Sequence, residues 1–389
     1  MKKALLFVVS IIFLTASWWL LRDPGLPVQA TRVTQPGSSR LSELLGGARD
    51  AGFPLVLEPR EFRFPSDHGP HPEYRNEWWY ATGNLDGDDG RRFGFELTLF
   101  RFALSASPPE DASAWRSNQV YIGHLALTDV DAGSFRVAQR YSRGALGLAG
   151  ATAAPVRVWL EDWEMSVPPS GDGAAATPWH IRAAGDDFGL DLTLAPAKDP
   201  VLNGRDGLSQ KSAEPGNASY YYSLSRLDAV GKVAAGGMSR AVSGSAWIDR
   251  EWGSSALARN QQGWDWFALQ LEDGTELMYY QLRRDDGSTD PMSSGTWVLE
   301  DGRSRRLEAG DVALEVLDYW DSPAGGRYPM GWRLAVPGIA LDVRIRPVLE
   351  SQELVTNVRY WEGAVDVDGS RGDNRVRGRG YVELTGYAD

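Results

Sequence analysis

The sequence contains no cysteine. This absence excludes disulfide bonds, thiol catalysis, zinc–thiolate sites and a lipidated N-terminal cysteine. It does not argue for the cytoplasm, because a chain of 389 residues can bury cores that are stable without covalent cross-links.

Basic charge and several well-known catalytic motifs are also missing. The net charge is −12, and no basic stripe alternates with aromatic residues, so we expect no nucleic-acid partner. The sequence has no Gly-x-Ser-x-Gly elbow, no phosphate-binding loop and no dinucleotide fingerprint. We therefore expect neither α/β-hydrolase, phosphoryl-transfer nor nicotinamide chemistry, and no cofactor.

Histidine is rare, with four residues: His68, His71, His124 and His180. The first two lie in the segment 67–73, which is either a metal site or a loop packed against the base of a barrel. Its His-x-x-His spacing on a proline-broken loop lacks the helical i, i+4 geometry of zinc hydrolases, so we expect no metal. His124 lies on an expected strand, where it either faces a cavity or is hydrogen-bonded within a sheet.

The N-terminus carries one long apolar run. Lys2 and Lys3 precede the run 4–21, and residues 28–30 offer a small-x-small cleavage site. The segment is either a cleaved secretory signal or an uncleaved signal anchor, because the run is long for a signal and just long enough to span a bilayer. Both alternatives predict a periplasmic or other extracytoplasmic protein. It would be membrane-associated if the anchor is uncleaved.

Beyond the N-terminus, helical periodicity is nearly absent and alternation with a period of two dominates. Apolar and polar residues alternate in 93–99, 188–194 and 339–345, and short turn signals such as Asp86-Gly87 and Asp301-Gly302 separate the runs. Such runs are typical of antiparallel strands that are buried on one face. Many short strands joined by hairpins indicate sandwiches or up-and-down barrels.

Two stretches, 77–87 and 263–274, echo each other. Each contains a tryptophan, an aromatic residue two positions later, a leucine and an acid-then-Gly turn, as shown by the pairs Trp78/Trp264, Tyr80/Trp266 and Leu85/Leu271. A hairpin used twice predicts two β-domains of one architecture. We expect a signal or anchor in 1–30, a linker in 31–59, an N-terminal domain in 60–255 and a C-terminal domain in 256–389. Of the three long loops, 198–218 is either a lid over a cavity mouth or an idle insertion.

The sequence is rich in tryptophan, and one short segment combines tryptophans with charged residues. Sixteen tryptophans suit either ordinary β-cores or the walls of a ligand cavity. In the segment 247–252, alternation places Trp247, Asp249 and Glu251 on one face and Arg250 and Trp252 on the other. A buried carboxylate beside an indole would have a raised pKa and could act as an acid. The alternative is a structural ion pair at the domain junction.

Several blocks together resemble one known family. They are 71–80, 83–85, 219–223, 244–252, 263–267, 360–365 and 378–387. The blocks are similar to the AttH-like family, which includes the carotenoid 1,2-hydratases (hydroxyneurosporene synthases), over roughly residues 55–387. The resemblance implies an all-β fold with two lipocalin-like (calycin) barrels in tandem. It also implies a secreted protein that accompanies an ABC-type export permease.

The hydratase branch of the family adds water to an isolated alkene, which needs a carboxylic acid, aromatic faces for a carbocation and a placed water. This sequence departs from that branch at two places. Arg250 stands where the hydratases carry His, and the strand 277–282 has tyrosines with no Asp two residues on. Arginine cannot titrate as histidine does. An acid role would therefore fall to Asp249, Glu251 or Asp265.

These observations lead to three hypotheses. The first is an extracytoplasmic module that binds a hydrophobic, lipid-like or isoprenoid-like molecule and assists an ABC-type exporter; the second is a hydratase-like lyase; the third is an interaction protein that binds permease partners. Besides the three candidate acids, we expect ligand contacts from Trp78, Tyr80, His124, Tyr221, Trp247, Trp252, Trp264, Trp266 and Tyr280.

Overall fold

The computed structural model describes residues 52–107, 113–169, 177–254 and 257–388. The expected signal or anchor segment and residues 31–51 of the expected linker lie outside these ranges. In the described part there is no α-helix, only three short 3-10 helices: η1 (Ser66–His68), η2 (Ala309–Asp311) and η3 (Pro337–Ile339). None of these helices is long and apolar enough to cross a membrane.

The first large sheet has thirteen antiparallel strands. Its strands are β1 (Asn76–Gly87), β2 (Arg92–Ala103), β3 (Gln119–Asp129), β4 (Ser134–Arg143), β5 (Ala149–Ala153), β6 (Val156–Leu160), β7 (Trp163–Val167), β8 (Trp179–Ala184), β9 (Phe188–Pro196), β10 (Val201–Leu202), β11 (Leu208–Gln210), β12 (Ala218–Ala235) and β13 (Met238–Gly253). They follow the order β4-β3-β2-β1-β13-β12-β9-β8-β7-β6-β5, with β10 and β11 beside β12. The sheet curls until β5 and β6 return to β3 and β4, which makes a nearly closed barrel.

The second large sheet has ten strands and forms a half-barrel. Its strands are β14 (Gln261–Leu271), β15 (Glu276–Arg284), β16 (Ser294–Val298), β17 (Ser304–Glu308), β18 (Ala313–Val316), β21 (Trp332–Val336), β22 (Leu341–Pro347), β23 (Glu353–Leu354), β24 (Tyr360–Arg371) and β25 (Asn374–Thr385). A small separate hairpin consists of β19 (Tyr319–Asp321) and β20 (Arg327–Pro329). The all-β fold with two lipocalin-like sheets is therefore as predicted.

The repeated sequence stretch forms the same structure in both sheets. β1 pairs with β2, and β14 pairs with β15, each as an antiparallel hairpin. The first sheet ends at Gly253 and the second begins at Gln261, on either side of the expected boundary at 255/256. Both sheets belong to one compact unit, so a division into separate folding domains stays a prediction.

Each sheet has its own solid core on its concave side. Alternate residues of the strands fill the first barrel, among them Trp79, Leu97, Leu125, Trp163 and Trp179. Others fill the half-barrel, among them Phe267, Tyr279, Trp332, Val343 and Val382. Buried side chains thus fill the concave side of each sheet.

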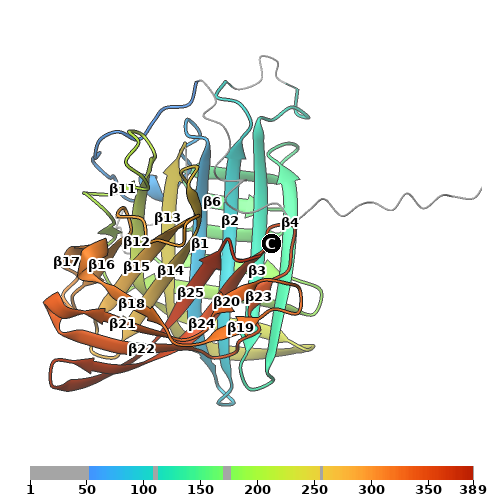
Figure 1. Cartoon of the computed structure of the whole chain (residues 1–389). Coiled ribbons are helices and arrows are strands. Elements are labelled where there is room, and N and C mark those ends of the chain that lie inside the picture. Colours follow the sequence, from blue (N-terminus) through green and yellow to red (C-terminus); the bar gives the residue numbers. More distant parts are fainter. Residues whose placement is uncertain (1–51, 108–112, 170–176, 255–256, 389) are drawn as a thin grey trace, which may run out of the picture. The chain divides into compact units, whose positions relative to one another are not determined.

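A third apolar layer lies between the two sheets. It combines Tyr80, Tyr221 and Trp247 of the first sheet with Trp266, Met278 and Tyr381 of the second. In Figure 1 the strands β14, β15, β24 and β25 cross in front of β1, β2 and β13. The sheets come close because Gly94 has no side chain: a Cβ atom there would lie 2.6 Å from the Cβ of Ala364.

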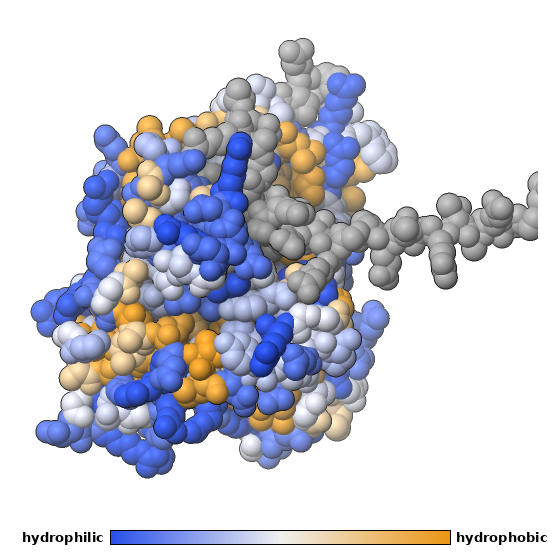
Figure 2. Space-filling model, viewed as in Figure 1, coloured by the Kyte–Doolittle hydropathy of each residue, from blue (hydrophilic) through white to orange (hydrophobic). Residues whose placement is uncertain are grey.

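Residues 52–59, which the sequence assigned to the linker, pack against the first sheet. Val56 is buried with Tyr220 and Trp252, and the backbone oxygens of Pro54 and Glu58 accept side-chain hydrogen bonds. On the face seen in Figure 2, hydrophilic residues cover most of the described surface, with smaller apolar patches between them.

Candidate active site

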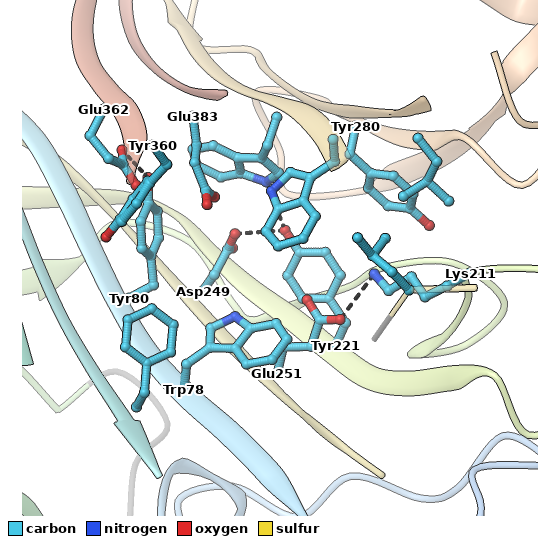
Figure 3. A pocket seen from close by; sticks show the side chains of 15 residues that line it. Trp78, Tyr80, Lys211, Tyr221, Asp249, Glu251, Tyr280, Tyr360, Glu362 and Glu383 are labelled. Carbon is cyan, nitrogen blue, oxygen red and sulfur yellow. Dashed lines mark hydrogen bonds and ion pairs between the residues drawn. The ribbon is translucent and has the colours of Figure 1, made fainter. Parts of the chain in front are cut away.

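One pocket lies between the two sheets. Its empty volume is about 730 Å³, including the open space at its mouth. The lining residues come from both sheets, from the segment 198–218 and from the connection between the sheets: Trp78, Tyr80, Phe100, Lys211, Tyr221, Asp249, Glu251, Leu257, Trp264, Trp266, Tyr280, Leu282, Tyr360, Glu362 and Glu383 (Figure 3). Eight of the twelve residues expected to form the site lie in this wall.

The repeated aromatic pairs meet in this pocket. Trp78 and Tyr80 project from β1, while Trp264 and Trp266 project from β14. The rings of Tyr80 and Trp266 contact each other edge to face, with centroids 5.2 Å apart. The two copies of the hairpin therefore line one shared cavity between the sheets, rather than two separate barrel interiors.

Asp249 lies at the centre of the pocket and is almost fully buried. Its Oδ1 accepts hydrogen bonds from Ser223 Oγ at 2.5 Å and Trp247 Nε1 at 2.7 Å, and its Oδ2 accepts one from the Tyr221 hydroxyl at 2.6 Å. Burial raises the pKa of Asp249 to about 7, and the nearby Glu251 adds to this, although the three hydrogen bonds oppose it. The carboxyl group is thus poised to give or take a proton near neutral pH.

Glu251 lies two residues further along β13 and forms an ion pair. Lys211 Nζ lies 2.9 Å from its Oε1, and the Ser219 hydroxyl donates to the same carboxylate. Burial alone would lower the pKa of Lys211, but Glu251 holds it above its usual value. Lys211 belongs to the segment 198–218, so part of this segment does close one side of the pocket.

Two more carboxyl groups line the wall from the second sheet. Glu362 on β24 and Glu383 on β25 are neighbours in register, and Glu362 Oε2 accepts a hydrogen bond from the Tyr80 hydroxyl at 3.0 Å. In Figure 3, Glu383 points toward Asp249, while Glu362 lies beside Tyr360. Burial, together with Asp249 and Glu251, raises the pKa of Glu383 to about 8.

Individual sequence motifs did not single out these residues. The pocket contains seven that were not expected: Phe100, Lys211, Leu257, Leu282, Tyr360, Glu362 and Glu383. The only available signal was that Tyr360, Glu362 and Glu383 lie within the blocks that carry the family resemblance. In the sequence pattern alone, a glutamate that faces a pocket looks the same as a glutamate that faces solvent.

Two expected ligand contacts lie directly behind the wall. Trp247 supports Asp249 through its indole nitrogen. The Nδ1 atom of His124 lies 2.5 Å from the hydroxyl of Tyr360, and its Nε2 lies 2.6 Å from the side-chain nitrogen of Gln139. Burial lowers the pKa of His124 to about 3, so this ring is neutral and positions Tyr360.

Two other expected residues point away from the pocket. Trp252 stacks on the ring of His71, with centroids 3.7 Å apart, on the opposite face of β13. Asp265 lies on the opposite face of β14 from Trp264, where Arg283 Nε at 2.9 Å and the Tyr387 hydroxyl at 3.0 Å donate to it. Because successive side chains of a strand point to opposite faces, neither residue contributes to the pocket surface.

Arg250 also faces away, toward the base of the first barrel. Its guanidinium donates to the backbone oxygens of Trp78 and Gly69 at 2.6 Å and lies 3.2 Å from the buried carboxylate of Glu77. Burial would raise the pKa of Glu77, but Arg101, His71 and Arg250 hold it well below its usual range. Arg250 is therefore part of a structural ion-pair network, so the first departure from the hydratase pattern lies outside the pocket wall.

The segment 67–73 packs against this network. The His68 ring lies 2.5 Å from the Tyr222 hydroxyl, and the His71 ring lies 3.3 Å from Asp67 and 3.4 Å from Glu77. Across the described ranges, no group of three or more His, Asp or Glu side chains is arranged to hold a metal ion.

The fold and the site together define a class: a two-sheet, lipocalin-like protein with a buried acid in an aromatic pocket between its sheets. The sequence model of the AttH-like family matches residues 55–387. The chain belongs to the AttH-like family.

One solved structure agrees with this assignment, and two more distant ones share the fold. A protein from Nitrosomonas europaea assigned to AttH is 34% identical, with a TM-score of 0.77 over 87% of this chain and 100% of that one. Kievitone hydratase from Nectria haematococca is 16% identical, with a TM-score of 0.65 over 86% of this chain and 99% of that one. CghA, solved with Sch210972, is 13% identical, with a TM-score of 0.50 over 90% and 98%. The search of curated proteins found no match.

Proposed function

We propose that the protein binds a hydrophobic, isoprenoid-like molecule in the pocket between its sheets and adds water across one of its carbon–carbon double bonds. The observation that carries the proposal is Asp249. This acid is buried, has a pKa raised to about 7, and lines a cavity whose other walls are mainly aromatic. An apolar alkene and its proton donor would therefore meet in a place that excludes most bulk water.

The reaction has three stages: transfer of a proton to the alkene, formation of a carbocation and attack by water. The protonated Asp249 transfers its proton to the less substituted carbon, and the π bond breaks to leave a tertiary carbocation. The oxygen of water then bonds to that carbon, and the excess proton returns to the Asp249 carboxylate. The net change is alkene plus water to tertiary alcohol, and the acid is regenerated.

The aromatic walls suit the intermediate. The rings of Trp78, Trp264, Trp266 and Tyr221 line the pocket around Asp249, and an aromatic face attracts a cation by about 2 kcal/mol in a desolvated site. After the proton transfer, the Asp249 carboxylate provides negative charge on the same wall. The name of kievitone hydratase states a hydration reaction, and its shared fold is compatible with this chemistry, although fold alone does not decide function.

The test is turnover of isoprenoid alkenes by the purified protein in ¹⁸O-labelled water, followed by mass spectrometry. We expect the product to gain one labelled oxygen. General-acid contributions are typically ~10²–10⁴-fold, so Asp249→Asn should lower the rate by at least ~100-fold. The exposed Asp228→Asn on β12 is the matched control and should leave the rate unchanged. Equal rates in wild type and Asp249→Asn would remove Asp249 from the mechanism.

A second candidate function is binding without chemistry. Leu282 lines the pocket two residues after Tyr280, where the hydratase pattern implies an aspartate, so one expected catalytic group is absent. In this case the protein would carry a hydrophobic ligand to or from an ABC-type exporter. Native mass spectrometry that finds a co-purified apolar molecule, together with no turnover of any alkene, would favour this function.

The proposed location follows from the sequence. The apolar run 4–21 after Lys2 and Lys3 supports an extracytoplasmic protein, which is where an exporter accessory would act. Fractionation of cells that express the full chain tests the location. Co-purification with a neighbouring permease tests the partnership.

A further inference from the structure

Three glutamates lie near one another beside the pocket, and we call them the carboxyl cluster: Glu362 on β24 and Glu383 on β25, which line the pocket, and Glu96 on β2, which does not. Glu96 and Glu362 are completely buried, while Glu383 keeps some accessible surface because it faces the pocket. Besides burial, the charge of Glu383 raises the pKa of Glu96, and the charges of Glu383 and Glu96 raise the pKa of Glu362. The cluster forms where the two sheets pack, so the structure brings together residues that are nearly 290 positions apart in the sequence.

The cluster lacks the cations that accompany other buried carboxylates of this protein. Glu77 contacts Arg101 and Arg250, and Glu276 contacts Lys198 and Arg226. Within the described ranges, no Lys, Arg or His nitrogen is paired with a cluster carboxylate. The cluster receives hydrogen bonds from the hydroxyls of Thr98 and Tyr80 and from the side chain of Trp264. A buried, charged carboxylate without a cation is strongly disfavoured.

Polar atoms at the cluster are also left without partners. Glu96 Oε2, Glu362 Oε1 and the Tyr381 hydroxyl are buried, and none has a hydrogen-bond partner in the described part of the chain. Such atoms are uncommon in folded proteins and each calls for an explanation. Glu362 also lines the pocket, so a rotation of its side chain would present the oxygen that lacks a partner to a ligand.

Aromatic rings surround this end of the pocket. Tyr80 and Tyr360 lie beside Glu362 in Figure 3, and Phe100 and Trp78 line the same wall, with ring centroids 6.5 Å apart. Aromatic faces beside carboxyl oxygens are the usual setting for binding organic cations.

We propose that the carboxyl cluster binds the protonated amine of the ligand, with the apolar part of that ligand lying along the aromatic walls toward Asp249. The inference rests on the proposed function in that it takes the pocket as the ligand site. It adds the class of ligand: an apolar molecule that carries a cationic nitrogen.

An ammonium group fits the cluster better than an alcohol or an acid. It offers three donors and a positive charge, so it can reach free oxygens of Glu362 and its neighbours and contact aromatic faces at once. A hydroxyl offers one donor and no charge. A carboxylate would add negative charge beside three carboxyl groups, and the pocket-lining cation Lys211 is already paired with Glu251.

Burial and mutual repulsion also raise the pKa of Glu362 well above its ordinary value. The pKa of Glu383 is raised to about 8, so the empty cluster holds a proton near neutral pH, and an incoming ammonium group would take its place. The displaced proton goes to solvent, so the charge of the buried site changes little on binding.

The test uses three ligands of equal chain length, octylammonium, 1-octanol and octanoate, with calorimetry on the purified full chain at neutral pH. We expect octylammonium to bind at least ~10-fold more tightly than 1-octanol, and octanoate to bind most weakly. Glu362→Gln should lower the affinity for octylammonium by at least ~10-fold and leave that for 1-octanol within ~2-fold.

The exposed Asp228→Asn on β12 is the matched control, because it removes a carboxylate outside the pocket. It should retain the preference for octylammonium. Equal affinity for octylammonium and 1-octanol, or a preference kept in Glu362→Gln, would overturn the inference and leave the pocket as a site for neutral apolar ligands. If none of the three ligands binds, the proposed function fails together with this inference.

Discussion

Replacing the proposed acid should stabilise the protein at alkaline pH. The ordinary pKa of an aspartate is 3.8, and burial raises that of Asp249 to about 7. Between these values the folded chain holds a proton that the unfolded chain has released, so the free energy of unfolding falls as pH rises from about 4 to about 7. At about 1.4 kcal/mol per tenfold difference in proton affinity, the loss is roughly 4 kcal/mol once the group is fully charged.

Asparagine resembles the protonated acid, because it keeps an acceptor for Trp247 and offers a donor to Tyr221. Asp249→Asn should therefore have nearly the same free energy of unfolding as the wild type at pH 4. At pH 9 the variant should be more stable than the wild type by roughly 2–4 kcal/mol, because water that enters the wild-type pocket partly solvates the charged Asp249.

Urea denaturation followed by tryptophan fluorescence between pH 4 and pH 9 measures this difference. The control is the exposed Asp228→Asn on β12, whose stability should follow that of the wild type. The reasoning would be refuted if Asp249→Asn were less stable than the wild type at pH 9, or if the difference did not vary with pH. A confirmed gain in stability together with lost turnover would identify Asp249 as a group kept for function at a cost to the fold.

Three further predictions concern the surroundings of the pocket. Arg250→Ala leaves the buried carboxylate of Glu77 short of one partner and should lower the free energy of unfolding by roughly 3–5 kcal/mol in urea titrations; a change below ~1 kcal/mol would contradict the ion-pair network. Trp264→Ala removes part of the pocket wall and should lower the affinity for an apolar fluorescent dye by at least ~10-fold in titrations; unchanged affinity would mean that the dye binds elsewhere. Asp265→Asn alters the opposite face of β14 and should leave dye affinity within ~2-fold, measured in the same titrations; a larger loss would mean that Asp265 reaches the pocket.

Alternation along single strands predicted much of the site. The pattern in 247–252 places Asp249 and Glu251 on one face and Arg250 and Trp252 on the other, and the structure shows this separation. The same rule, applied to β14, would have separated Asp265 from Trp264 and Trp266. Asp265 was nevertheless considered as an acid because the resemblance, rather than the strand pattern, suggested it.

The carboxyl groups of the second sheet could not be predicted in this way. Glu362 and Glu383 alternate with apolar residues, as solvent-facing glutamates do, so the sequence alone gives no reason to bury them. They are buried because the convex face of one sheet packs on the other, and Gly94 opposite Ala364 permits that approach.

Local patterns in the sequence account for the elements of this protein: antiparallel strands, a hairpin led by tryptophan and used twice, and the face on which each side chain lies. These properties depend on the two-residue period of a strand and on turn residues. The position of the cavity between the sheets depends on contacts between residues far apart in the chain, so it follows from the packing of one sheet on the other. The same packing buries Asp249 away from solvent, and this burial raises its pKa.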